Sequence, residues 1–81
     1  MWVRLEEHRV VGKILATARQ RAKVSQDDLA ARLHKPQSFV SNYERGQRRL
    51  DVLELIRISE ALGNDPRRVF ADILRRSAKG D

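Results

Sequence analysis

The sequence predicts an all-α fold of five short helices. Apolar residues recur three and four positions apart along most of the chain, and no segment alternates apolar with polar residues as a strand does. Pro36 and Pro66 stand where helices can begin, and Gly46 and Gly63 stand where helices can end. With 81 residues, the chain can bury one modest core. A single small domain follows.

The first helix is predicted from its apolar stripe, with cations near its end. The stripe consists of Val10, Val11, Ile14, Leu15, Ala18 and Ala22. Arg19, Arg21 and Lys23 suit the negative end of the helix dipole. The start stays open, because Trp2 and Leu5 extend the pattern toward the N-terminus.

A second helix is predicted from about residue 26 to 33. Ser25 is a good N-cap, and Asp27 and Asp28 suit the positive end of the helix. Its inner face consists of Leu29, Ala30 and Leu33. A break of three residues, His34 to Pro36, separates this helix from the next.

A third helix is predicted from about residue 37 to the stop at Gly46. Pro36 is either next to its N-cap or its first residue. The inward positions are Val40, Tyr43 and Glu44. The outward positions carry short hydrogen-bonding side chains where a surface helix usually carries Lys and Glu: Gln37, Ser38, Ser41 and Asn42.

Two further helices complete the prediction. Asp51 is the cap of the fourth, which ends at Gly63, and Asp65 and Pro66 begin the fifth. The predicted buried residues are Val52, Leu55, Ile56 and Leu62 in the fourth helix, and Val69, Phe70, Ile73 and Leu74 in the fifth. The tail from Ser77 to Asp81 is expected to fray.

Composition favours a polyanionic partner and excludes several classes of site. There are 17 Lys and Arg against 11 Asp and Glu, a net charge of +6. Without Cys, neither a disulfide framework nor a zinc finger is possible. His8 and His34 have no partner at metal-ligand spacing, so no metal site is indicated. No cofactor is indicated either, and 81 residues leave no room for a separate domain that binds a small-molecule ligand. No signal peptide or membrane span is predicted, and we expect a cytoplasmic protein.

The segment SQDDLAARLHKPQSFVSNYERG resembles the phage-repressor and Cro type of helix-turn-helix, a family also named after the xenobiotic response element. The matching positions are Ser25, Gln26, Leu29, Ala30, Leu33, Val40, Ser41, Glu44, Arg45 and Gly46, with Arg19, Leu55, Leu62 and Gly63 outside the segment. The resemblance covers about residues 10–74. It implies a compact five-helix lambda-repressor-like DNA-binding domain at 10–75, with the helix-turn-helix at about 26–45. Residues 1–9 are expected to form an extension or to lengthen the first helix, and residues 76–81 are expected to form a frayed tail.

Three turn residues depart from the family pattern. His34 replaces a glycine, so it must adopt or avoid a positive φ, which His tolerates better than most residues. Lys35 replaces a common apolar residue, and Pro36 replaces a common Ser or Thr. The start of the third helix is therefore open by about one residue.

The resemblance implies that the third helix contacts base edges in the major groove. The expected base contacts are Gln37, Ser38, Ser41 and Asn42. Gln and Asn can bond bidentately to adenine, whereas Ser is more permissive and Ser41 could favour a phosphate. The alternative is a solvent-facing polar surface that caps its own backbone. The sequence leaves two roles for Phe39, which could cover the core or touch a thymine methyl.

The resemblance also implies phosphate contacts and one structural ion pair. The expected phosphate contacts are Gln26, Lys35, Arg45, Arg48 and Arg49, of which one arginine could be merely solvated. Gln26 would also brace the third helix; the alternative is simple capping by Ser25, and the two are compatible. Arg19 and Glu44 are expected to pair and tie the first helix to the third.

The predicted function is a sequence-specific regulator of transcription that binds double-stranded DNA, most simply a repressor of bacterial or phage type found on the nucleoid. A homodimer on a palindromic operator is expected, with half-sites about 34 Å apart. Its interface could use Trp2, Leu53, Ile58 and part of the fifth helix, for which core packing is the alternative. Restriction-modification control and an antitoxin role are variants of this prediction.

A protein-interaction or adaptor domain of the same fold is the alternative class. An enzyme is not predicted. The sequence has neither a nucleophile paired with His, nor a carboxylate pair in a pocket, nor a phosphate-binding Gly loop.

Overall fold

The computed structural model describes residues 3–79, which form five helices and no strand. The helices are α1 (Leu5–Arg21), α2 (Gln26–Leu33), α3 (Gln37–Glu44), α4 (Val52–Ala61) and α5 (Pro66–Lys79). The predicted all-α class is confirmed. Leu5 does extend the first helix, whereas Trp2 lies outside the described residues. No helix of residues 3–79 is long and apolar enough to span a bilayer.

Caps fix the helix boundaries near the predicted positions. The Ser25 hydroxyl accepts a hydrogen bond of 3.0 Å from the Asp28 N–H at the start of α2. At α4, the Asp51 carboxylate accepts from the Glu54 N–H at 2.8 Å, and the Glu54 carboxylate accepts from the Asp51 N–H at 3.0 Å. Each such cap stabilises a helix by about 1 kcal/mol. Gly46 and Gly63 follow α3 and α4 with φ of 76° and 75°.

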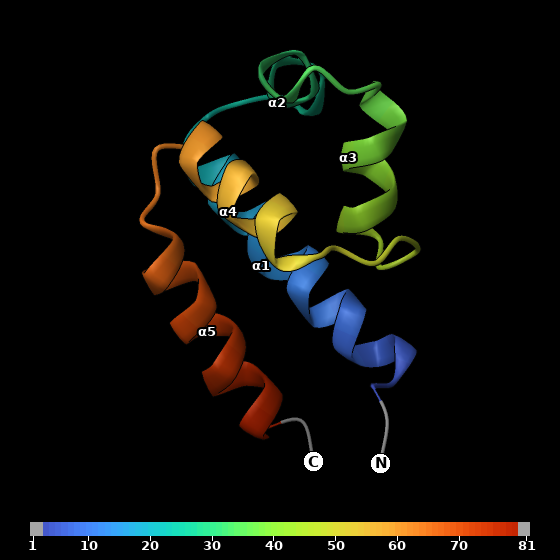
Figure 1. Ribbon diagram of the computed structural model, residues 1–81, viewed down its shortest axis with the longest axis vertical. Helices are drawn as coiled ribbons and strands as arrows, with labels where there is room; N and C mark the ends of the chain where they lie inside the picture. The colour runs from blue at the N-terminus through green and yellow to red at the C-terminus, as the bar shows by residue number, and fades with distance from the viewer. Residues whose placement is uncertain (1–2, 80–81) are drawn as a thin grey trace.

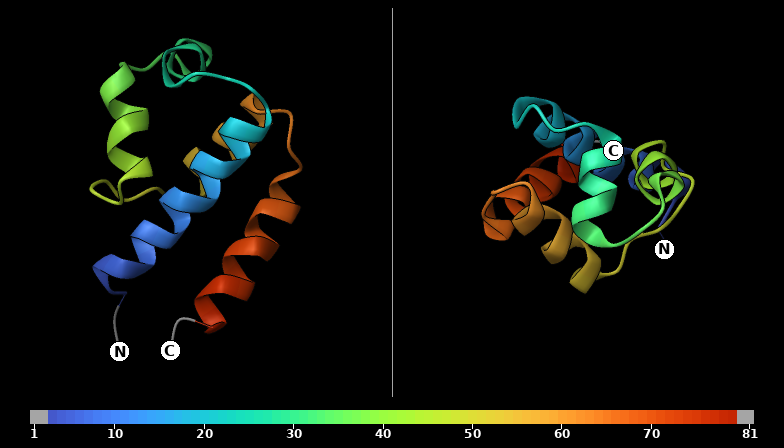
Figure 2. Two further views of the ribbon diagram at one scale, coloured as in Figure 1. Left: turned by 180° about the vertical axis from the view of Figure 1, so that it is seen from behind. Right: turned by 90° about the horizontal axis from the view of Figure 1, so that it is seen from above.

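The helices pack around α1, which runs along the length of the molecule (Figures 1 and 2). Helices α3 and α5 both contact α1 and lie on different sides of it. Helix α2 contacts α3 and α4, and α4 also contacts α5. The start of α1 and the end of α5 lie at the same end of the molecule (Figure 1). This leaves one side of α3 uncovered by the other helices.

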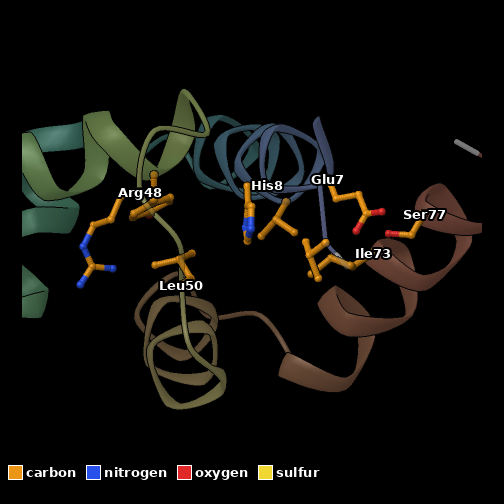
Figure 3. A pocket seen from close by; sticks show the side chains of 9 residues that line it. Glu7, His8, Arg48, Leu50, Ile73 and Ser77 are labelled. Carbon is orange, nitrogen blue, oxygen red and sulfur yellow. The ribbon is translucent and has the colours of Figure 1, made fainter. Parts of the chain in front are cut away.

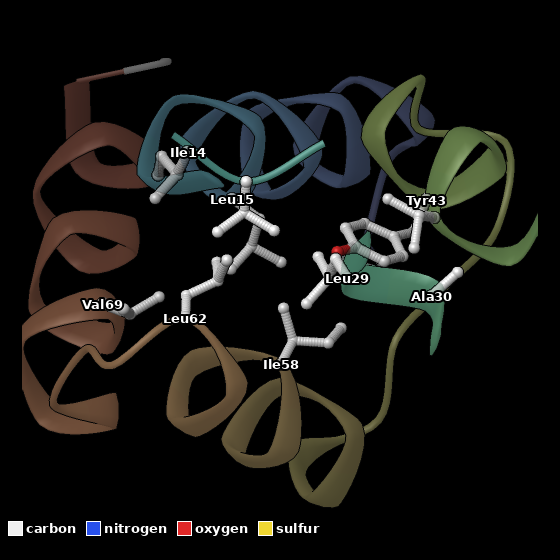
Figure 4. Close-up of a cluster of buried hydrophobic side chains, with 10 residues drawn as sticks. Ile14, Leu15, Leu29, Ala30, Tyr43, Ile58, Leu62 and Val69 are labelled. Carbon is white, nitrogen blue, oxygen red and sulfur yellow. The ribbon is translucent and has the colours of Figure 1, made fainter. Parts of the chain in front are cut away.

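The core lies between all five helices (Figure 4). Its buried apolar residues are Ile14, Leu15, Val24, Leu29, Ala30, Val40, Tyr43, Ile58, Leu62 and Val69. Partly buried side chains, including Val10, Val11, Ala18, Leu33, Leu55 and Ile73, pack against them. The inner faces predicted for α2 and α3 are confirmed.

Some predicted buried positions are wrong. In α4, Val52 is 70% exposed, whereas Ile58, predicted as a surface residue, is 1% exposed. The buried stripe of this helix passes through Ile58, Ser59 and Leu62, so it begins after the first turn. Ala22, predicted on the stripe of the first helix, is exposed because α1 ends at Arg21. Ile58 is therefore excluded from any dimer surface.

The prediction for the last helix needs two corrections. Phe70 and Leu74 are 52% and 56% exposed, and only Val69 and Ile73, four residues apart, face the core. The expected tail is also helical as far as Lys79, and residues 80 and 81 lie outside the described residues. The extra turn lies beside the start of α1, since Ile73 and Ser77 line a cavity together with Val3.

The Tyr43 hydroxyl is buried in this core and has no hydrogen-bond partner within residues 3–79. Its ring points into the core (Figure 4), and burial raises the pKa of the hydroxyl. Tyr43→Phe removes the unsatisfied group and keeps the ring, so we expect the free energy of unfolding to rise by about 1 kcal/mol. Urea denaturation measures this change. A loss of stability in Tyr43→Phe would show that the hydroxyl is hydrogen-bonded in the folded protein.

Candidate nucleic-acid interface

In the turn between α2 and α3, His34 adopts the left-handed conformation, one of the two possibilities that the sequence left open. His34 has a φ of 56°, its N–H donates to the Ala31 carbonyl at 3.2 Å, and the Lys35 N–H donates to the Ala30 carbonyl at 3.0 Å. Pro36 is the N-cap of α3 with an extended backbone, so α3 begins at Gln37. The short turn holds α2 and α3 in contact with each other.

One face of α3 is fixed to the domain. Val40 is fully buried and Tyr43 is 1% exposed. Gly12 allows α1 to approach the end of α3 very closely, because a Cβ at this position would lie 2.3 Å from the Tyr43 carbonyl oxygen and 2.6 Å from that of Glu44. The orientation of α3 is therefore set by backbone contact with α1 as well as by side-chain packing.

Arg19 and Glu44 form the ion pair that ties α1 to α3. Arg19 Nε donates to Glu44 Oε2 at 2.7 Å, and Nη2 donates to Oε1 at 3.2 Å. Arg19 Nη1 also donates to the Val24 carbonyl at 2.9 Å. The two charged side chains are only 12% and 7% exposed. The hydrogen bond to Glu44 raises the pKa of Arg19.

Two glutamines continue this pair to the start of α3. Gln26 Nε2 donates to Glu44 Oε1 at 2.9 Å, and Gln37 Nε2 donates to Gln26 Oε1 at 2.6 Å. We call this chain of Arg19, Glu44, Gln26 and Gln37 the polar relay. Gln26 is half-buried and Gln37 is exposed, so the polar relay runs from the interior to the surface. The structure thus brings an expected phosphate contact and an expected base contact together.

The four expected base contacts occupy the uncovered side of α3. Gln37 and Ser38 are exposed, and Ser41 and Asn42 are half-buried. Gln37 and Ser41 are four residues apart, as are Ser38 and Asn42, so each pair lies on one face of the helix. Arg45 Nη2 donates to Asn42 Oδ1 at 2.9 Å, which places the guanidinium on this face too.

The other expected phosphate contacts differ in their surroundings. Arg49 is exposed. Arg48 is half-buried, and its two terminal nitrogens donate to the Glu54 carboxylate at 3.0 and 2.9 Å. This hydrogen bonding lowers the pKa of Glu54 and raises that of Arg48. Arg48 is therefore held by Glu54, whereas Arg49 projects into solvent.

Phe39, left open by the sequence, covers the core. Its ring meets that of Tyr43 edge to face at 5.4 Å. The Arg48 guanidinium lies 4.6 Å from the Phe39 ring centre and the Lys35 ammonium lies 5.7 Å from it. These cation–π contacts hold Lys35 and Arg48 beside the turn.

Sequence reasoning missed Gly12 and Glu54. A glycine inside a helical pattern commonly has a packing reason, which is the signal that Gly12 offers. Glu54 stands three residues after Asp51, the spacing of a capping box. Its second role, as the partner of Arg48, has no such signal in the sequence.

A small cavity lies between the start of α1, the loop after α3 and the end of α5 (Figure 3). Glu7, His8, Arg48 and Leu50 are among its lining residues, and its volume is about 220 Å³. Small-molecule sites usually begin at about 300 Å³. Within residues 3–79 no group of three or more potential ligands could hold a metal ion.

Comparisons with known proteins agree on one family. A helix-turn-helix family model, HTH_3, matches residues 15–69. An XRE-family-like protein from Pseudomonas syringae pv. tomato is 37% identical and has a TM-score of 0.79, covering 88% of this chain and 87% of its own.

Two restriction-modification controller proteins are also similar in structure. C.AhdI from Aeromonas hydrophila is 29% identical with a TM-score of 0.75, covering 80% of this chain and 98% of its own. A mutant of C.Esp1396I is 25% identical with a TM-score of 0.81 over the full length of both chains. The comparison with curated proteins gives no match.

Proposed function

The chain belongs to the helix-turn-helix family HTH_3, and we propose that it is a regulator of transcription that binds a specific sequence of double-stranded DNA with α3 in the major groove. The observation that carries the proposal is the division of α3 into two faces. Val40, Tyr43 and Glu44 hold the helix, and the opposite face presents short polar side chains to solvent. Amide and hydroxyl side chains of this kind can hydrogen-bond to base edges in the major groove.

We assign the base contacts to Gln37, Ser38, Ser41 and Asn42. The first residues of a recognition helix enter the groove most deeply, which favours Gln37 and Ser38. The side-chain oxygen of Asn42 accepts a hydrogen bond from Arg45, and the amide N–H groups of Asn42 remain to donate to a base acceptor. A role as a plain solvated surface does not account for the polar relay that orients Gln37.

Phosphate contacts are assigned to the residues around this face. Gln26 lies at the N-terminus of α2, where backbone N–H groups favour an anion. Arg45 and Arg49 flank the end of α3, and Lys35 lies in the turn. Arg48 contributes less in this proposal, because Glu54 already neutralises it. Each phosphate that a cation neutralises makes the fall of log K with log salt concentration steeper by about 0.9.

We further propose a homodimer that represses transcription from a palindromic operator, acting on DNA in the cytoplasm. Phe70 and Leu74, four residues apart on α5, are exposed apolar side chains suited to a symmetric contact, and Leu53 on α4 is 66% exposed. Sedimentation is expected to show a dimer at micromolar concentration. A monomer at high micromolar concentration would contradict this part of the proposal.

The similarity to two restriction-modification controllers favours that role as one form of the proposed regulator. An adaptor domain, the other class considered, predicts that salt and substitutions on α3 leave DNA affinity unchanged. No enzymatic role is proposed.

Selection of bound sites from random DNA duplexes tests the proposal. Wild-type protein is expected to enrich a palindrome, and Asn42→Ala is expected to lose about 1 to 3 kcal/mol of discrimination at one position in each half-site. Failure to enrich any sequence at physiological salt would refute specific DNA recognition. Thr17→Ala, an exposed change on α1, serves as the control and should enrich the wild-type sequence.

A further inference from the structure

We propose that Arg9 on α1 binds a phosphate of the DNA backbone beside the end of α3. The inference deepens the proposed function and rests on it, because it requires α3 to lie in the major groove. It extends the DNA-binding surface to α1, a helix outside the helix-turn-helix. A backbone contact of this kind adds affinity and fixes the position of the domain, but it does not select a base.

Arg9 lies directly against the turn that ends α3. A Cβ at Gly46 would lie 2.4 Å from Cγ of Arg9 and 2.8 Å from its Cα, so the stem of the Arg9 side chain fills the space that Gly46 leaves free. Gly46 is buried, whereas Arg9 is exposed. An arginine can pack its stem against the protein and keep its charged end in water. The guanidinium of Arg9 therefore leaves the end of α3 toward solvent.

The same turn already carries two cations with proposed phosphate contacts. Arg45 directly precedes Gly46, and Arg49 follows it three residues later. Arg9 brings a third guanidinium to this turn from a different helix (Figure 1). Within residues 3–79 none of the three has a carboxylate partner, and the side chain of Arg45 donates only to the neutral Asn42. Like charges gathered without a counter-ion raise the local potential and attract an anion.

Capping of α3 is the alternative role for Arg9, because a cation at the end of a helix can donate to its last carbonyls. The Tyr43 carbonyl accepts instead from the Gly46 N–H at 3.0 Å. The Asn42 carbonyl accepts from the Gln47 N–H at 2.9 Å. Arg9 makes no hydrogen bond or ion pair within the described part of the chain. All of its side-chain donors are therefore left for a group outside residues 3–79.

The packing of α1 on α3 brings Arg9 to the DNA together with the recognition helix. Gly12, one turn after Arg9, lets α1 meet the last carbonyls of α3, so the two helices are held together by backbone contact. The end of a recognition helix lies toward the sugar–phosphate backbone that borders the groove. A guanidinium placed there can bind a phosphate through two parallel hydrogen bonds.

Arg9→Gln tests this contact, because glutamine keeps the Cβ and Cγ that pack on Gly46 and removes the charge. Affinity for the selected DNA site is measured by fluorescence anisotropy between about 50 and 200 mM salt. The fall of log K with log salt concentration should be less steep than in wild type by about 0.9. The loss of affinity should therefore shrink by about 3- to 4-fold across this range. The melting temperature and the selected sequence should stay those of wild type.

Arg68→Gln is the matched control. Arg68 is exposed in the first turn of α5, which lies on a different side of α1 from α3 (Figure 2). The change in net charge is the same, so the salt dependence should stay that of wild type. Arg9→Lys keeps the charge and should restore the steeper slope. Ethylation of single phosphates then locates the contact, since at least one ethyl group that weakens wild-type binding should have no effect on Arg9→Gln.

The outcomes separate this inference from the proposed function. If wild type enriches no sequence, the proposed function fails and the inference fails with it. If wild type selects a site and Arg9→Gln keeps the wild-type slope, only the inference is overturned, and Arg9 has a packing role alone. An equal loss of slope in Arg68→Gln would also overturn it, because that loss would report net charge and not a contact.

Discussion

Arg19→Ala is expected to lower the free energy of unfolding by about 3 to 5 kcal/mol, because it leaves the buried Glu44 carboxylate without its countercharge. A domain of this size has a total stability on the order of 4 to 12 kcal/mol, so much of it would be lost. Each kcal/mol corresponds to about 4 to 8 °C in melting temperature. Circular dichroism during urea and thermal denaturation measures the change.

The matched control is Arg57→Ala. Arg57 and Glu60 form an ion pair of 3.2 Å whose side chains are 70% and 55% exposed. Exposed pairs contribute about 0 to 1 kcal/mol, so this variant should stay close to wild type. The double variant Arg19→Met with Glu44→Leu should recover much of the stability, since it leaves no unpaired charge. A wild-type melting temperature for Arg19→Ala would contradict the structural role of the pair.

Helix boundaries were predictable because they depend on local chemistry. Ser25 and Asp51 form the caps that their residue types favour, and Gly46 and Gly63 take the left-handed conformations expected of C-terminal glycines. These features need only the few residues on either side. The order and approximate length of the helices could therefore be derived from the sequence.

The exact buried faces were less predictable, because the chain has more apolar residues than its core can hold. Phe70 and Leu74 fit the helical period as well as Val69 and Ile73 do, and the arrangement of α1 and α4 decides between them. In α4, Ile58 is buried and Val52 is exposed, the reverse of the prediction, for the same reason. Periodicity identifies a helix, whereas its neighbours determine which stripe is covered.

The packing of the candidate site was predicted in part, and its contacts to DNA stay predictions. The resemblance to a known family implied that Arg19 and Glu44 pair and that Gln26 braces the third helix, and the structure has hydrogen bonds of both kinds. The hydrogen bonds from Gln26 to Glu44 and from Gln37 to Gln26 depend on side-chain directions that spacing does not fix. The Arg48–Glu54 pair likewise joins a loop to the first turn of α4.

Gly12→Ala is the second change for which we expect a large loss of stability. Its methyl group would lie 2.3 Å from one backbone oxygen of α3 and 2.6 Å from another, and backbone atoms cannot turn aside as a side chain does. Overpacking of this kind costs about 1 to 3 kcal/mol or more, and we expect the upper end. Alanine gains back about 1 kcal/mol of helix propensity, which does not offset the clash.

A comparison with Gly63→Ala separates crowding from backbone strain. Gly63 has a φ of 75° and nothing within 4 Å of the position of a Cβ, so only conformational strain of about 1 to 2 kcal/mol is expected there. Gly12→Ala should be the less stable variant in urea denaturation. It should also weaken DNA binding at temperatures where it remains folded, because α3 must move away from α1. Equal or greater stability of Gly12→Ala would mean that the contact of α1 with the end of α3 is looser than the structure indicates.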